Sequence, residues 1–277
     1  ALAIVLLDQI GWRGMFMIGA VPFVTLLPLA FWKMPESVAW LAARGRMQEA
    51  EALAVQTGIE ILATVEAHEV EDSGAVGYRG LFGDFLLPAL LIGLMSAMGL
   101  LLVYSLNTWL PELMLRAGFN AKGSLSFLLV LNGAAALGPI IVARFADRFG
   151  PKPVVAASFS LGAVAIMALT LKLPLAVLLV IVALVGVGTS GTQTLIYGFV
   201  ANYFPTRVRG AGVAWCAGFG RIGGVGGPLI GGLLIAAGLS IDTIFFVLAG
   251  LALAGILLAL LIPPAAKTSL QDIDATH

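Results

Sequence analysis

A single arginine interrupts the apolar run at residues 210–238. At about 1.5 Å per residue, Arg221 lies roughly 16 Å from the start of this run, near the middle of a ~30 Å hydrocarbon layer. A guanidinium stays charged there, so it needs an anion, backbone carbonyls or water as its partner. None of the fifteen Asp and Glu residues lies in the middle of an apolar run. Arg221 is therefore a candidate for binding an anion, or for a structural role with carbonyls freed by Pro228.

The composition predicts that this arginine belongs to an integral membrane protein. The 277 residues are 60% hydrophobic and 11% charged, with a mean hydropathy of +1.04, whereas soluble domains are about 25% charged. The net charge is zero, which gives no reason to expect a nucleic acid as partner. The one cysteine, Cys216, excludes a disulfide framework and a cysteine metal cluster. No basic-then-apolar signal segment follows Ala1, so we expect that the natural start of the chain is missing.

The apolar runs predict an all-α polytopic membrane protein. Each run is apolar around the whole helix and has the length of a membrane-spanning helix rather than of a barrel strand. An apolar stub at 1–7 precedes a polar turn and is predicted to end an earlier helix. Seven full spans are predicted, at residues 12–32, 84–107, 123–143, 151–171, 175–198, 210–238 and 242–262.

Further polar or aromatic side chains within these spans could contact a ligand. Asn132 is about ten residues into its span, where an asparagine can bind a ligand or hydrogen-bond a neighbouring helix. Packing also explains the others, because large aromatic side chains and single amides often fill space between helices. The candidates for substrate binding are Arg221, Asn132, Asn107, Tyr104, Gln193 and Trp215.

The polar segments indicate the orientation of the chain. If the segment after the first full span is cytoplasmic, that side carries most of the Lys and Arg residues, and the carboxyl terminus is also cytoplasmic. The long polar stretch at 33–83 is predicted to form amphipathic helices on this side. Its acidic patch could hold a metal ion, but acids on a solvated loop usually only make it soluble. We expect no metal and no cofactor; the patch contains Glu66, His68, Glu69, Glu71 and Asp72.

Three segments resemble loops of major facilitator superfamily transporters. Residues 35–50, with Pro35-Glu36-Ser37 and Arg44-Gly45-Arg46, resemble the loop after the sixth helix of that superfamily. Residues 143–152, Ala-Arg-Phe-Ala-Asp-Arg-Phe-Gly-Pro-Lys, resemble its signature between helices eight and nine. Residues 205–210, Pro-Thr-Arg-Val-Arg-Gly, resemble the loop before helix eleven.

The resemblance implies a major facilitator-type helical bundle that lacks its first four to five helices. The missing N-terminal helical bundle of the same protein would then be a partner of this chain, together with the lipid bilayer. The implied parts are the end of the N-terminal bundle at 1–32, a cytoplasmic interdomain loop at 33–83, a six-helix bundle at 84–262 and a cytoplasmic tail at 263–277.

The resemblance also implies gating residues at the cytoplasmic side. Asp147 and Arg148 would lie in a tight interhelical turn and pair with helix ends or charges of the opposite bundle. Arg207 would receive the matching contact from the other half. Anchoring at the membrane surface is the alternative for basic residues such as Arg144 and Lys152, but it does not explain the negative charge of Asp147.

The eleventh helix favours one branch of the superfamily. Phe219-Gly220-Arg221-Ile222-Gly223, followed by Gly227-Pro228, resembles the aromatic acid:proton symporter family, while the adjacent glutamines of the sugar porters are absent from 99–111. This implies an inner-membrane transporter that imports a small aromatic carboxylate, such as benzoate or hydroxybenzoate, with protons by alternating access. The guanidinium fork of Arg221 can hold a carboxylate in two hydrogen bonds. The family's proton-carrying aspartates lie on the first helix, which is absent here.

Alternatives from the same and from other classes stay open. The substrate could be another organic anion or a sugar, and a non-transporting scaffold or sensor could share the fold. Gly188-Thr189-Ser190-Gly191 superficially matches the nucleophile turn of an intramembrane serine protease. That chemistry needs a base beside the serine, and no histidine lies in a predicted span, so we do not expect an enzyme.

Overall fold

The computed structural model describes residues 11, 13, 14, 17, 18, 20–33, 41, 46–57, 75–171 and 173–264. The chain divides into two compact units, Ala1–Asp72 and Ser73–His277. The acidic patch at 66–72 and the tail beyond 264 lie outside the described residues. Of the predicted span at 12–32, only the part from residue 20 onward is described without a gap.

The first unit contains two described helices, α2 (Val21–Lys33) and α4 (Met47–Thr57). Ala50 and Ala54 of α4 are buried together with Leu41. Arg46 forms an ion pair with Glu49 at 2.6 Å, one helical turn away, and this hydrogen bond holds the pKa of the Glu49 carboxyl below its usual range. Within the described residues, α4 thus has one buried side, and the predicted cytoplasmic position of the whole polar stretch stays a prediction.

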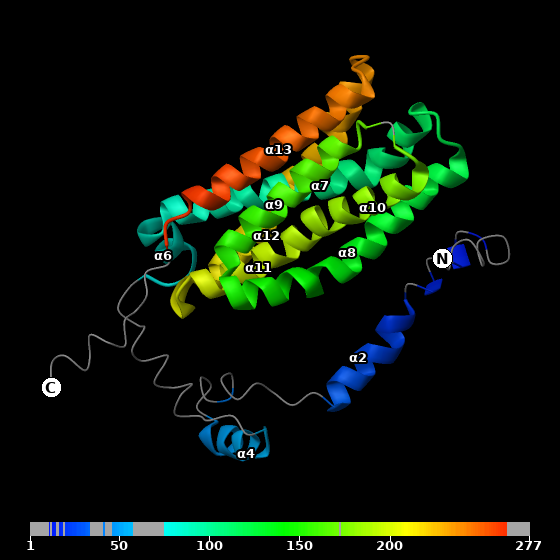
Figure 1. Cartoon of the computed structure of the whole chain (residues 1–277). Helices are drawn as coiled ribbons and strands as arrows, with labels where there is room; N and C mark the ends of the chain where they lie inside the picture. The colour runs from blue at the N-terminus through cyan, green and yellow to red at the C-terminus, as the bar shows by residue number, and fades with distance from the viewer. Residues whose placement is uncertain are drawn as a thin grey trace. The chain divides into compact units, whose positions relative to one another are not determined.

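The second unit is a bundle of long apolar helices that runs from cyan to red in Figure 1. Among the described residues, six helices are long and apolar enough to cross a membrane. The fourth of these spans, Leu175–Tyr203, is continuous from α10 through a π-helical turn into α11. The elements are α6 (Gly77–Asp84), α7 (Leu86–Arg116), α8 (Ala121–Phe149), α9 (Pro151–Ala168), α10 (Leu175–Gly186), η1 (Val187–Gly191), α11 (Thr192–Tyr203), α12 (Thr206–Ala236) and α13 (Ile241–Leu261).

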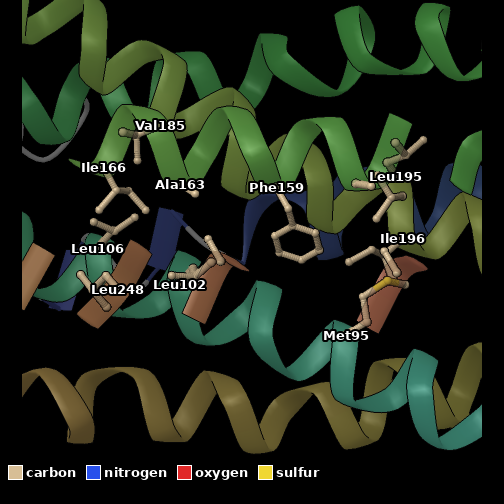
Figure 2. Close-up of a cluster of buried hydrophobic side chains, with 14 of the residues drawn as sticks. Met95, Leu102, Leu106, Phe159, Ala163, Ile166, Val185, Leu195, Ile196 and Leu248 are labelled. Carbon is tan, nitrogen blue, oxygen red and sulfur yellow. The ribbon is translucent and has the colours of Figure 1, made fainter. Parts of the chain in front are cut away.

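Helix α7 provides much of the core of this bundle. It packs extensively against α12 and also against α8 and α13. Leu102 and Leu106 of α7 are fully buried and belong to one cluster with Phe159 of α9 and Leu248 of α13 (Figure 2). Inside a bilayer, such contacts stabilise the bundle through close packing, because lipid tails are as apolar as leucine.

Helices α8 and α12, in contrast, each leave one face uncovered. Leu125 and Leu129 on α8 are more than half exposed, as are Val225 and Leu229 on α12. Both helices nevertheless pack against α7. Among the described helices of this unit, none packs on these faces of α8 and α12, and polar residues there are open to a ligand or to another segment.

The helix ends correct the predicted position of two gating candidates. Helix α8 continues to Phe149, so Asp147 and Arg148 lie in its last turn and not in an interhelical turn. The turn itself is Gly150, whose φ of +85° suits glycine, and Pro151 starts α9 at once. A span predicted from hydropathy ends at the first charged residue. The helix itself continues until a residue such as Gly150 adopts a non-helical backbone conformation.

Candidate functional site

Glycines on one face of α12 bring Arg221 close to α7. A Cβ atom on Gly223 would overlap the carbonyl oxygen of Ala97, and one on Gly227 would lie 2.5 Å from that of Leu101. Small residues at such positions let two helix backbones approach closely, so these glycines serve the packing of α12 against α7. The glycines of α12 that would contact α7 if they carried a side chain are Gly220, Gly223, Gly224, Gly227, Gly231 and Gly232.

Arg221 meets Tyr104 of α7 across this interface. Its Nη1 donates a hydrogen bond to the Tyr104 hydroxyl at 3.1 Å, and the tyrosine ring lies over Gly224, where no side chain displaces it. Within the described residues, Arg221 has no acidic partner. The Tyr104 O–H and the other guanidinium N–H groups have no acceptor there either. This set of donors suits a carboxylate.

One turn further along α7, Asn107 meets Asn132 of α8. Asn132 Nδ2 donates to Asn107 Oδ1 at 3.0 Å and also to the carbonyl oxygen of Leu128 at 3.0 Å. Asn107 Nδ2 donates to the carbonyl oxygen of Val103 at 2.8 Å. The two amides thus connect α7 to α8, while Tyr104 connects α7 to α12.

These four side chains, Tyr104, Asn107, Asn132 and Arg221, are termed the polar cluster. Arg221 and Asn132 are exposed, Tyr104 is 38% exposed and Asn107 is half-buried. The polar cluster therefore lies on the side of the bundle that no described helix covers. The structure brings together four of the six side chains that the sequence nominates for substrate binding.

The other two nominated side chains have partners inside the bundle. Gln193 of α11 is only 5% exposed and donates through Nε2 to the hydroxyl of Ser96 at 3.1 Å, while its Oε1 has no hydrogen-bond donor. The indole N–H of Trp215 donates to the carbonyl oxygen of Ala89 at 2.8 Å. The structure does not place either side chain in the polar cluster, so the sequence-based prediction that they contact substrate stays untested.

Arg207, a predicted gating residue, has its partner within the same unit. Its Nη2 donates to Asp84 at 2.8 Å, its Nη1 donates to the carbonyl oxygen of Ala75 at 3.2 Å, and its guanidinium lies 5.7 Å from the Phe85 ring centre. The side chain is 18% exposed. Nothing in the sequence pointed to Asp84 as this partner, because 123 residues separate the two.

The other two gating candidates lie at the exposed end of α8. Asp147 borders a small cleft of about 220 Å³ between α8 and α11. Arg148 lies over the ring of Phe149 at 5.3 Å from the ring centre. Both side chains are exposed, so they are available for contacts with a segment outside the bundle. No cluster of three potential metal ligands occurs in the described part of the chain.

Residues 122–275 match the family model of the Major Facilitator Superfamily. The chain belongs to this superfamily of membrane transporters, and its helices form a multi-pass membrane protein. The proton:xylose symporter XylE, solved with 6-bromo-6-deoxy-D-glucose, has the same fold, with a TM-score of 0.68 over 97% of this chain and 60% of the symporter. The two share 17% sequence identity, so the likeness concerns the fold alone.

Curated relatives transport aromatic acids. The chain is 34% identical to the gentisate transporter of Corynebacterium glutamicum, over 86% of this chain and 49% of the relative. It is 34% identical to the gallate transporter of Pseudomonas putida, over 88% and 55% of the two chains. It is 28% identical to the benzoate transport protein of Acinetobacter baylyi, over 84% and 51%. The chain thus spans about half the length of these relatives.

Proposed function

We propose that this chain is part of a secondary transporter that imports a small aromatic carboxylate together with protons across the inner membrane. The observation that carries the proposal is the polar cluster, where Arg221 offers unpaired N–H groups beside the Tyr104 hydroxyl. The names of the relatives, which transport gentisate, gallate and benzoate, support the same class of substrate.

The chemistry of the polar cluster fits a carboxylate held at its Arg221 end. The planar guanidinium can donate two parallel hydrogen bonds to the two carboxylate oxygens, and Tyr104 can donate a third. The bound anion would in turn satisfy a cation that lies near the middle of the membrane. A sugar is neutral and would leave the guanidinium charge uncompensated, which favours the organic anion.

Gating would occur at the cytoplasmic ends of α8 and α12. We assign Asp147 and Arg148 to contacts with the opposite helical bundle, because both are exposed on the last turn of α8. Arg207 would act through Asp84, to which it is already bonded, and would hold the start of α12 against α6. The polar cluster holds no carboxylate and no histidine, so proton transfer would depend on residues elsewhere in the protein.

Uptake of labelled 4-hydroxybenzoate by cells that express the complete protein tests this function. Wild type, Arg221→Gln and the matched control Arg116→Gln are compared with and without a protonophore. Arg116 is a suitable control because it pairs with Glu112 on the surface of α7 at 2.8 Å, away from the polar cluster. We expect a protonophore-sensitive uptake that Arg221→Gln abolishes and Arg116→Gln retains.

Three results would separate the alternatives. Uptake that the protonophore leaves unchanged would contradict proton coupling but not the substrate class. Cells that accumulate a sugar or another organic anion, and no aromatic acid, would contradict the substrate class. A protein that reaches the membrane and moves none of these solutes would support a scaffold or sensor.

A further inference from the structure

The asparagine pair of the polar cluster, Asn107 and Asn132, has hydrogen-bonding groups without a partner among the described residues. Each Nδ2 faces the carbonyl oxygen of the residue four positions earlier, Val103 or Leu128, and this fixes which end of each amide is the nitrogen. Asn132 Nδ2 uses its second hydrogen on Asn107 Oδ1. One N–H of Asn107 and the Oδ1 of Asn132 have no partner among the described residues.

The two amides thus leave one free donor and one free acceptor, which are the two partners that a hydroxyl group requires. A phenolic O–H donates one hydrogen bond and accepts another. The hydrogen bonds to Val103, Leu128 and between the amides hold both side chains in place, so a ligand would bind without having to order them first.

The amide pair is also separate from the anion-binding end of the polar cluster. Tyr104 and Asn107 are one helical turn apart on α7, with Cβ atoms about 5–6 Å from each other. Their side chains then reach different neighbours, Arg221 on α12 and Asn132 on α8. A ring whose carboxylate is bound at Arg221 would extend toward the amides from its meta and para positions, whereas an ortho hydroxyl would stay beside the carboxylate.

We propose that Asn107 and Asn132 recognise a ring hydroxyl and make the transporter selective for meta- or para-hydroxylated aromatic acids over unsubstituted benzoate. This inference rests on the proposed transport of aromatic carboxylates. A hydroxyl that replaces water in these two hydrogen bonds improves apparent affinity by about tenfold, whereas benzoate leaves the amides with unpaired groups.

The test measures KM and kcat for uptake of labelled 4-hydroxybenzoate, 2-hydroxybenzoate and benzoate by the complete protein. Wild type is compared with Asn132→Ala and with the control Ser126→Ala. Ser126 lies on the same helix and bonds only to the carbonyl oxygen of Lys122. We expect a KM for 4-hydroxybenzoate about tenfold below those of the other two acids. Asn132→Ala should remove this advantage and change the KM for benzoate little, and Ser126→Ala should retain it.

The outcomes distinguish the inference from the function on which it rests. Equal KM values for 4-hydroxybenzoate and benzoate in the wild type would overturn the inference and leave aromatic-acid transport standing. The inference would also be overturned if Asn132→Ala raised both KM values by the same factor, because the pair would then only support the helices. Absence of uptake of all three acids would contradict the proposed function itself.

Discussion

Two groups of polar side chains lie in the same bundle of membrane-spanning helices, and they differ in what surrounds them. The polar cluster around Arg221 is exposed and has spare hydrogen-bond donors and acceptors. The pair Ser96–Gln193 is enclosed between α7 and α11, and its hydrogen bond stays inside the protein. Both consist of residues that the sequence places within membrane spans. Intramembrane polarity therefore suggests a binding site only when the helix face that carries it is uncovered.

The difference follows from how α7 is placed. This helix packs against α12, α8 and α13, so Ser96 on one of its faces is fully buried while Tyr104 on another is accessible. Gly220 of α12 packs on Ser96, where a Cβ atom would lie 2.5 Å from the hydroxyl oxygen, and the next residue, Arg221, lies on the uncovered side. Adjacent positions of one helix thus belong to different environments.

Separating α7 from α12 should have the largest effect, since Arg221 meets Tyr104 across this contact and Gly220 packs on Ser96 there. We expect Gly223→Leu to abolish uptake, because the added side chain would overlap the backbone at Ala97. Overpacking of this kind costs about 1–3 kcal/mol or more. Thermal unfolding of the purified protein and uptake together measure this effect. Gly226→Ala, where nothing lies within 4 Å, is the control; a normal Gly223→Leu protein would refute the close packing.

Tyr104→Phe should weaken the polar cluster and leave the fold intact. The substitution removes the hydroxyl that accepts from Arg221 and that we propose donates to the carboxylate. The loss of about one net hydrogen bond predicts a rise in the KM for 4-hydroxybenzoate of about three- to tenfold. Uptake kinetics check this prediction, with unfolding temperature as the control for stability. An unchanged KM would place the carboxylate elsewhere.

Loss of the Asp84–Arg207 ion pair should have a smaller effect, and on stability first. The pair ties α6 to the start of α12, but Asp84 is half-exposed, so the contribution is expected to be below about 1 kcal/mol. Asp84→Asn should therefore lower the unfolding temperature slightly and leave the KM for substrate unchanged. A large rise in KM would mean that this ion pair contributes to the binding site.

Gln193→Met should have the smallest effect of the four. Methionine has a similar length and needs no hydrogen-bond partner, so it removes both the bond to Ser96 and the unpaired Oε1. The two changes offset each other, and the net effect on stability is expected to be within about 1 kcal/mol. Uptake should equal that of the wild type. A large loss of uptake would mean that Gln193 contributes to substrate binding.

The membrane spans could be predicted from the sequence, because the hydropathy of a segment depends only on which residues it contains. The predicted spans at 151–171 and 242–262 agree with α9 (Pro151–Ala168) and α13 (Ile241–Leu261) to within a few residues. Helices α7 and α8 run beyond their predicted ends at 107 and 143, because Pro111 and Arg144 do not stop a helix that is packed against its neighbours.

The partners within the site could not be predicted. Arg221 and Tyr104 are separated by 117 residues, and Asn132 and Asn107 by 25. Hydropathy says nothing about the rotation of one helix against another. It therefore could not predict that Gln193 is buried while Arg221 is exposed. The spacing of the glycines in α12 is a usable signal for this rotation, because it marks the face that packs closely on α7.

Direct binding to the complete purified protein tests the central claim most simply, that the exposed polar cluster and not the enclosed pair binds the aromatic carboxylate. Titration calorimetry with 4-hydroxybenzoate would compare wild type, Arg221→Gln and Gln193→Met. We predict that Arg221→Gln weakens binding by about tenfold or more and that Gln193→Met binds as the wild type does. Wild-type affinity in Arg221→Gln, or an equal loss in Gln193→Met, would contradict the claim.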